Sequence, residues 1–312
     1  MQSETPSHGR AYAALVLICF IWGTSWVATK EAVRYMPALQ MVGIRQIWAG
    51  ALYVIWFLVK KQPWPKGKQW WPILWLAFLN FILSNGLSTW GVKYISAGLG
   101  SIIGASFPLW LVILSLIRYK EKPTPLAWIG LIFGFSGICI VFYDHLTEFL
   151  DPNFRIGIAL SVTAAITWTI GTLYTKEHAL HFNPYFGIGL QMCISGITLM
   201  TISKMTGMSI PLTDIPAYSW LNITYLVLFS SVLAFVSYLY ALQKLPTSLV
   251  SIYAYINPIV AVLIGGAFFN ERLTVVILIG ALVTIMGVYL VNAALRQKRF
   301  FFWPSKSTGH RA

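Results

Sequence analysis

The sequence predicts an all-α integral membrane protein of ten transmembrane helices, arranged as two inverted five-helix repeats. Three observations predict it. Of the 312 residues, 57% are hydrophobic and only 10% are charged, too few to surround a soluble core of this size. Apolar runs of about 19 to 24 residues recur along the chain, and a helix of that length crosses a hydrocarbon layer of roughly 30 Å. The second half of the chain also repeats the first.

Ten apolar runs define the expected spans, five in each half. They cover residues 11–29, 39–59, 71–91, 97–117, 125–143, 156–175, 185–203, 219–241, 248–269 and 275–295. The first run lacks a basic leader and a small-residue cleavage site, so we expect it in the mature protein. The predicted units are therefore a tail (1–10), a first repeat (11–143), a linker (144–155), a second repeat (156–295) and a basic, aromatic tail (296–312).

The repeat shows in residues that recur at fixed offsets. Pro108, Glu121, Gly130 and Gly137 recur as Pro258, Glu271, Gly280 and Gly287, each 150 positions later, as from 108 to 258. Trp22, Lys30 and Glu31 match Trp168, Lys176 and Glu177 at an offset of 146, as from 22 to 168. Because five spans is an odd number, the second half must cross the membrane upside down. A binding site is then expected between the halves.

The basic residues predict the orientation. With the N-terminus in the cytoplasm, fifteen of the 22 Lys and Arg residues lie inside and six outside, and Arg45 lies within a span. The positive-inside rule therefore favours an inner-membrane protein with both termini in the cytoplasm. Topology and contact with anionic lipids account for the net charge of +13, so no nucleic-acid partner is predicted.

Ionisable groups within spans are costly and are functional candidates by default. All nine Asp and Glu residues and all five His residues fall in loops, tails or span ends, so no mid-membrane proton relay is predicted. Arg45 is the exception, and Gln191 occupies its position in the second repeat. The arginine could pair with a carboxylate or phosphate of a substrate, or it could extend to the interface and join helices through backbone carbonyls.

A proline lies well inside the fourth and ninth spans, Pro108 and Pro258. Each removes a helix hydrogen bond and frees a carbonyl, near Gly104 and Ala254, which predicts either a packing kink or a polar part of a solute path. Ser101 and Ser251 lie seven residues before the prolines, where a hydroxyl could meet a substrate or bond to the backbone.

Polar and aromatic side chains within the spans could hold a flat or amphipathic solute. The candidates are Trp22, Asn80, Asn85, Trp90, Trp168, Tyr238, Tyr253 and Asn257. Trp22 and Trp168 match across the repeats, so they line a cavity or pack between helices.

The glycines and two glutamates have structural interpretations. Gly130 and Gly134 form a GxxxG, which Gly137 extends, and Gly280 and Gly287 belong to the corresponding span of the second repeat; small residues of this kind let helices approach closely. Glu121 and Glu271 precede the fifth and tenth spans, where a carboxylate can accept from open backbone donors. A gating salt bridge is the alternative for these two carboxylates.

Taken together, these features resemble the EamA-type transporters of the drug/metabolite transporter superfamily. The resemblance rests on two five-span halves, on Phe20-Ile21-Trp22-Gly23-Thr24-Ser25 followed by Lys30, Pro37 and Arg45, and on a Glu nine residues before a Gly in both Glu121 to Gly130 and Glu271 to Gly280. It implies a carrier, usually an exporter of metabolites or toxic compounds, that works by alternating access. Gln191 stands where the family has an arginine, which argues against a mechanism that uses paired arginines.

We therefore expect a secondary exporter of a small amphipathic metabolite, amino acid-like or drug-like, with a central cavity lined from the first, third, fourth, sixth, eighth and ninth spans. No cofactor, metal or enzymatic activity is predicted, because the spans hold no buried His or Asp and no HExxH motif. A lipid-linked-sugar flippase and a non-transporting receptor or assembly factor remain alternatives. The choice between monomer and homodimer stays open.

Overall fold

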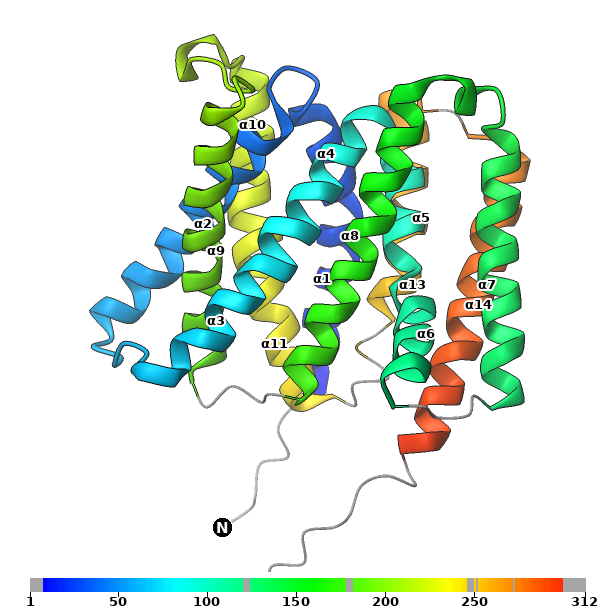
Figure 1. Cartoon of the computed structure of the whole chain (residues 1–312), viewed down its shortest axis with the longest axis horizontal. Coiled ribbons are helices and arrows are strands. Elements are labelled where there is room, and N and C mark those ends of the chain that lie inside the picture. The colour runs from blue at the N-terminus through cyan, green and yellow to red at the C-terminus, as the bar shows by residue number, and fades with distance from the viewer. Residues whose placement is uncertain are drawn as a thin grey trace, which may run out of the picture.

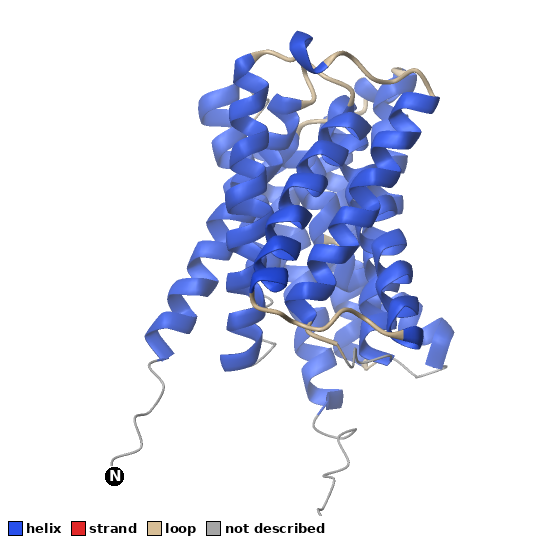
Figure 2. Cartoon of the chain, turned by 90° about the vertical axis from the view of Figure 1, so that its left-hand side faces the viewer, coloured by secondary structure: helices blue, strands red, loops and turns tan. Residues whose placement is uncertain are grey.

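The helices run side by side through a single bundle (Figure 1), and the view turned by 90° shows the same predominantly helical build (Figure 2). This computed structural model describes residues 8–119, 124–177, 182–245, 250, 252–271 and 273–299. Within these ranges every regular element is a helix, which confirms the predicted all-α membrane fold.

In the first repeat the α-helices are α1 (His8–Ala32), α2 (Ala38–Val59), α3 (Trp70–Leu76), α4 (Gly86–Tyr94), α5 (Ala97–Ala105), α6 (Phe107–Tyr119) and α7 (Pro125–Asp144). In the second they are α8 (Pro152–Glu177), α9 (Pro184–Met205), α10 (Ala217–Tyr225), α11 (Ala234–Lys244), α13 (Tyr253–Phe269) and α14 (Val275–Arg299). Short 3₁₀ turns are η1 (Gly67–Gln69), η3 (Glu148–Leu150) and η4 (Leu212–Asp214), and the π-helices are η2 (Ala77–Asn85) and η5 (Leu226–Leu233).

Nine helical segments in the described part of the chain are long and apolar enough to cross a membrane. They correspond to all the predicted spans except the ninth, for which the described helix is the shorter α13, Tyr253–Phe269. The predicted start of that span, at 248, falls in a stretch where only residues 250 and 252 onward are described. The chain is therefore a multi-pass membrane protein.

Several helices start where the sequence supplies a capping side chain. Ser96 Oγ accepts a hydrogen bond from the Leu99 amide at the start of α5, and Thr124 does so from Ala127 at the start of α7. Asn183 caps α9 through the amides of Tyr185 and Phe186. Such side chains satisfy backbone donors that a helix end leaves open, and a proline follows Thr124 and Asn183 because the first helical position needs no N–H.

Proline affects the fourth and ninth spans differently. The fourth span breaks at Ser106, between α5 and α6, while α13 continues through Pro258. At the break, Ser106 Oγ donates to the Ile103 carbonyl at 2.6 Å and accepts from Trp110 Nε1 at 3.1 Å. Thr169 on α8 donates to the Phe107 carbonyl at 3.3 Å. Side chains thus bond to carbonyls on either side of Gly104, the residue whose carbonyl Pro108 was expected to free.

Two pairs of spans with equivalent positions in the repeats pack backbone to backbone: α2 with α9, and α7 with α14. A Cβ added at Gly130 would lie 2.7 Å from the amide nitrogen of Val291, and one added at Gly50 would lie 2.7 Å from that of Cys193. A Cβ at Gly287 would overlap the backbone of Gly134. These glycines permit the close contact expected of small residues in membrane helices.

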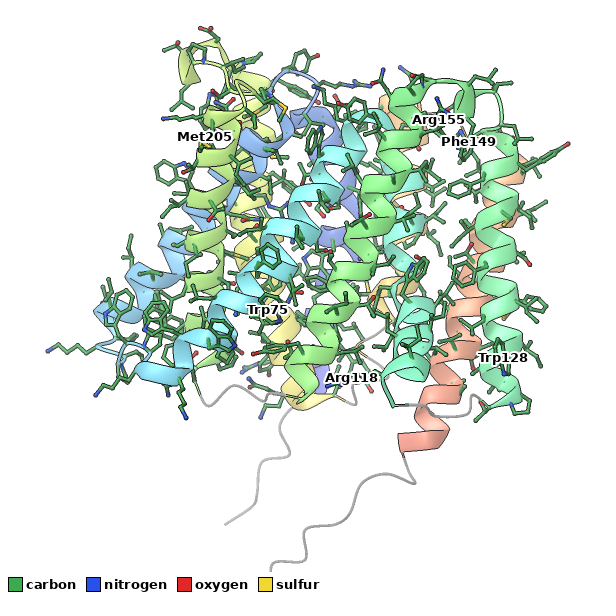
Figure 3. The ribbon with its side chains drawn as sticks, viewed as in Figure 1. Trp75, Arg118, Trp128, Phe149, Arg155 and Met205 are labelled. Atoms are coloured by element: carbon green, nitrogen blue, oxygen red, sulfur yellow. The ribbon has the colours of Figure 1, made fainter. Side chains whose placement is uncertain are left out.

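The outer faces of the bundle are apolar. Trp128 on α7 points away from the bundle (Figure 3) and is 53% exposed. Ile132 on α7 and Leu282 on α14 are also more than half exposed. A continuous apolar surface of this kind suits contact with lipid, where a helix does not need a polar outer face.

The α7–α14 contact predicts a stability difference between two glycines. Gly287→Ala should lower stability by about 1–3 kcal/mol, because the added methyl group overlaps backbone that cannot move cheaply. Gly187→Ala is the matched control, since its nearest neighbours would lie 3.8 Å away. Thermal unfolding of the purified proteins in detergent measures the difference. Equal melting temperatures for the two variants would contradict the proposed backbone contact.

Candidate functional site

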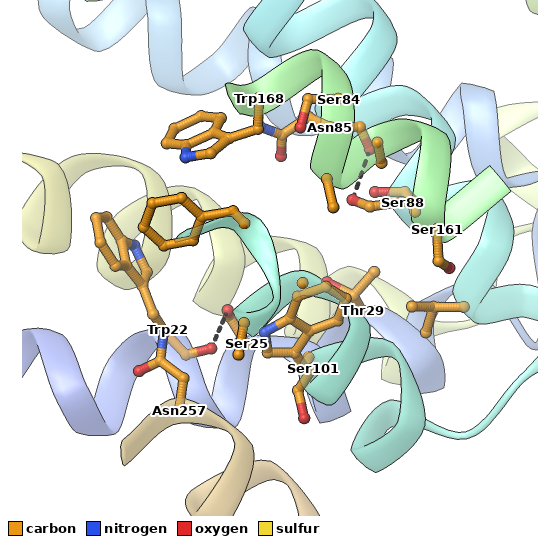
Figure 4. A pocket seen from close by; sticks show the side chains of 18 of the residues that line it. Trp22, Ser25, Thr29, Ser84, Asn85, Ser88, Ser101, Ser161, Trp168 and Asn257 are labelled. Carbon is orange, nitrogen blue, oxygen red and sulfur yellow. Dashed lines mark hydrogen bonds between the residues drawn. The ribbon is translucent and has the colours of Figure 1, made fainter. Parts of the chain in front are cut away.

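A cavity of about 200 Å³ lies at the centre of the bundle, between the two repeats (Figure 4). It is lined from the six spans that the sequence predicts, and α2 contributes Arg45 as well. Its volume lies below the roughly 300–1,000 Å³ typical of sites for drug-sized ligands, so it suits a small metabolite.

The lining combines aromatic rings, hydroxyls and amides. The aromatic residues are Trp22, Trp26, Phe107, Trp168, Phe235 and Tyr253. The uncharged polar residues are Ser25, Thr29, Ser84, Asn85, Ser88, Thr89, Ser101, Ser161, Ser230 and Asn257. Arg45 is the single charged residue in the described lining.

Seven of the fourteen predicted path residues meet in this cavity: Trp22, Arg45, Asn85, Ser101, Trp168, Tyr253 and Asn257. Ser101 Oγ donates to the Gly98 carbonyl at 2.6 Å, the backbone bond that was one of its two expected roles. The side-chain nitrogen of Asn257 donates to the carbonyls of Tyr253 and Cys19. Ser251 lies outside the described residues.

The other six predicted residues lie outside the lining. Asn80 packs against Gly171 of α8, and Trp90 packs among apolar residues of α2 and α9. Tyr238 lies behind Trp22, at a ring distance of 5.3 Å. Gln191 is buried in α9 and does not line the cavity. Pro108 in α6 and Pro258 in α13 are also buried outside the cavity lining. The sequence identifies polar residues in these spans but not the face on which each one lies.

In the described part of the chain, Arg45 bonds to serine hydroxyls of η5 and to no backbone carbonyl. It is 9% exposed, and Nε donates to Ser231 Oγ at 2.8 Å while Nη2 donates to Ser230 Oγ at 3.1 Å. The carbonyl of Ser230 accepts from Trp22 Nε1 at 3.2 Å. Ser230 therefore connects the charged group of the cavity to its aromatic wall.

The π-helical segments of the third and eighth spans place equivalent residues at the cavity. Ser84 and Asn85 of η2 correspond to Ser230 and Ser231 of η5 at the offset of 146, as from 84 to 230. Tyr53 Oη donates to the carbonyls of Ser231 and Val232, at 3.2 and 3.0 Å, within η5. Short π-helical stretches inside α-helices recur at functional sites because they displace side chains and leave carbonyls open.

Sequence reasoning missed most of the hydroxyl wall. Ser25 and Thr29 lie four residues apart on α1, and so do Ser84 and Ser88 on the third span. Hydroxyls at this spacing share one helix face, so the i, i+4 pattern within apolar spans could have identified them. Ser161 Oγ is buried without a hydrogen-bond partner among the described residues. That leaves a polar group available to a solute.

Charged side chains close the turn between α4 and α5, at the upper end of Figure 1. Lys30 Nζ donates to the carbonyls of Val92 and Ile95, at 2.9 and 2.7 Å. Glu271 accepts from the amides of Ala97, at 2.6 Å, and Gly98, at 3.1 Å. Glu271 thus caps the fourth span, in the other repeat, instead of the tenth span that it precedes. Glu121 lies outside the described residues.

The fold and the cavity define a class: a bundle of inverted five-span repeats around a central solute-sized chamber, which is the architecture of a membrane transporter. The model of the EamA-like transporter family matches residues 9–143 and 155–293. The chain belongs to this family.

The chain is similar in sequence to curated transporters over most of its length. It is 28% identical to an uncharacterized transporter of Synechocystis over 308 residues, covering 94% of this chain and 92% of the relative. It is also 28% identical to the uncharacterized inner membrane transporter YedA of Escherichia coli K12, covering 90% of each. A solved crystal structure at 16% identity matches with a TM-score of 0.64 over 93% of this chain and 99% of that one, which supports the fold alone.

Removal of the Glu271 carboxylate should lower the stability of the protein without removing a group from the cavity lining. Glu271→Ala should destabilise the protein by about 1–3 kcal/mol, because two backbone donors at the start of α5 lose a charged acceptor. Asp214→Asn, at an exposed 3₁₀ turn, is the control and should have little effect. Thermal unfolding in detergent tests this. An unchanged melting temperature for Glu271→Ala would rule out a capping role.

Proposed function

We propose that this protein is a secondary transporter that exports a small amphipathic metabolite across the inner membrane by alternating access. One observation carries the proposal: both repeats contribute polar and aromatic side chains to a single central cavity. In inverted-repeat transporters, one repeat moves against the other around a site at their interface.

The proposed orientation places both termini in the cytoplasm. In Figure 1, α1 begins and α14 ends at the same side of the bundle, as an even number of spans requires. The excess of Lys and Arg on that side supports the assignment through the positive-inside rule. The relative YedA is named as an inner membrane transporter, which supports the proposed membrane.

The lining favours a solute with an apolar, flat part and several hydrogen-bonding groups. Trp22, Trp26 and Trp168 offer ring faces, and the serine and threonine hydroxyls can donate or accept. None of the described lining residues is acidic. This composition supports movement driven by the solute's own gradient or by exchange, without a carboxylate in the cavity that carries protons.

Filling the cavity should stop transport. Ser88 faces the cavity from α4, and its hydroxyl donates to the Asn85 carbonyl at 3.3 Å (Figure 4). Ser88→Phe should reduce solute flux at least about tenfold in reconstituted vesicles, because the ring occupies the space of the solute. Ile132→Phe, which places the same aromatic side chain on the exposed face of α7, is the control and should transport normally.

The flux assay uses vesicles loaded in turn with amino acids, aromatic carboxylates, purines, sugars and aromatic cations. Protein-dependent efflux of one class, lost in Ser88→Phe and kept in Ile132→Phe, supports the proposal. Flux that Ser88→Phe leaves unchanged would mean that the cavity is not the solute path. If no solute class moves, the proposed transport activity is wrong.

A further inference from the structure

The charge of Arg45 has no counter-charge among the described residues. Its side chain is 9% exposed, and its partners are the neutral hydroxyls of Ser230 and Ser231. The hydrogen bonds described for Arg45 come from Nε and Nη2 and leave Nη1 unused. None of the described residues that line the cavity is acidic. The ion pairs described for other residues, Arg34 with Glu31 and His145 with Glu148, do not involve Arg45.

An arrangement of this kind is incomplete without a ligand. A guanidinium removed from water loses hydration that two hydroxyl groups replace only in part. Ionisable side chains within membrane spans are usually paired or line a substrate path. Arg45 lines the cavity, so the missing partner can enter with the solute.

We infer that the transported solute carries a carboxylate that pairs with Arg45, and that its net charge is negative. This inference deepens the proposed transport function and rests on it. A guanidinium and a carboxylate form short, parallel, charge-assisted hydrogen bonds, and Nη1 supplies the donor that the serines leave open. Binding of a monoanion makes the occupied cavity neutral.

The surroundings of Arg45 specify the rest of the solute. Ser230 accepts from Arg45 through its hydroxyl and from Trp22 through its carbonyl, so the carboxylate site adjoins an aromatic wall. Trp22 contacts Tyr253 at a ring distance of 4.9 Å, and Tyr253 also lines the cavity. An apolar or aromatic body next to the carboxylate fits this wall. An amino group would find hydroxyls and ring faces but no acidic partner in the described lining.

The site is single, although the scaffold is duplicated. The residue that corresponds to Arg45 in the second repeat is Gln191, which is 3% exposed within α9 and does not line the cavity. One anionic group can therefore bind, from the side of α2 and η5. Asn85 and Ser88, from the third span, add uncharged polar groups to the lining.

A matched series of ligands tests the charge requirement without any mutation. The compounds are 3-phenylpropanoate, its primary amide, phenylalanine, 3-phenylpropylamine and phenyl phosphate. Each is added to the purified full-length protein, and the melting temperature is measured, because a ligand that binds the folded state raises it. We expect the largest shift with 3-phenylpropanoate, a smaller one with phenylalanine, and little with the amide or the amine.

Variants at Arg45 connect the preference to this residue. Arg45→Gln, which introduces the residue of the second repeat, should weaken 3-phenylpropanoate binding about 10- to 100-fold and leave amide binding within about twofold. Arg45→Lys keeps the charge but not the planar fork, and should show an intermediate loss. Arg34→Gln removes an arginine outside the cavity and should bind normally.

The outcomes separate this inference from the proposed function. If the amide or the amine binds as well as the carboxylate, or if no compound of the series shifts the melting temperature, the inference is wrong. Stronger binding of phenyl phosphate would overturn the carboxylate assignment in favour of a phosphate. If a neutral or cationic solute is transported equally by wild type and Arg45→Gln, transport stands and the anion site does not. Arg45-dependent binding of 3-phenylpropanoate without flux would support the anion site and contradict transport.

Discussion

Backbone contact between corresponding spans is the constraint on which the rest of this structure depends. In a bilayer, helices gain little from hiding apolar surface, so they associate where small residues let their backbones meet. Gly50, Gly189 and Gly196 provide this between α2 and α9. Gly130, Gly137 and Gly287 provide it between α7 and α14. In Figure 1 the α2–α9 pair lies at the left side of the bundle and the α7–α14 pair at the right side. The remaining six spans lie between the two pairs, around the cavity. Each pair joins one repeat to the other, so neither repeat has to form the bundle alone.

The polar groups within this frame follow a second constraint, that each needs a partner away from water. At the α4–α5 turn, Lys30 donates to backbone carbonyls and Glu271 accepts from backbone amides, so both charged side chains have hydrogen-bond partners. The cavity differs, because the hydroxyl of Ser161 and one nitrogen of Arg45 have no partner among the described residues. Satisfied charges at the α4–α5 turn and incompletely satisfied polar groups in the cavity are the pattern expected of a scaffold around a binding site.

The sequence predicts the scaffold well and the site only in part, and the reason is physical. The length and hydropathy of apolar runs predict the spans, and residue offsets reveal the repeat, because neither depends on which helices are neighbours.

It is harder to predict whether a residue within a span faces the cavity, another helix or lipid. Lipid and protein interior have similar polarity, so spans such as α7 and α9 have no distinct polar and apolar faces. The periodicity of their residues therefore does not distinguish the face toward lipid from the face toward the bundle. The match of Trp22 and Trp168 across the repeats predicts either cavity lining or helix packing. Nothing in the sequence indicates that Asn80 and Gln191 lie outside the cavity lining. The π-helical turns in η2 and η5 also leave no recognisable pattern in the sequence.

The differences between the repeats are as informative as their likeness. Alternating access needs two similar halves, because exchanging their conformations opens opposite sides of one site. Recognition of a solute has no such requirement, and the cavity lining differs between the halves. Arg45 and its hydroxyl partners on η5 form one wall, while the amide of Asn85 and the hydroxyl of Ser84 occupy the equivalent positions on η2. The fourth span breaks at Ser106, while α13 remains continuous. Duplication therefore accounts for the frame and for the proposed movement. Divergence at a few cavity positions would set the orientation of the solute that we propose to bind there.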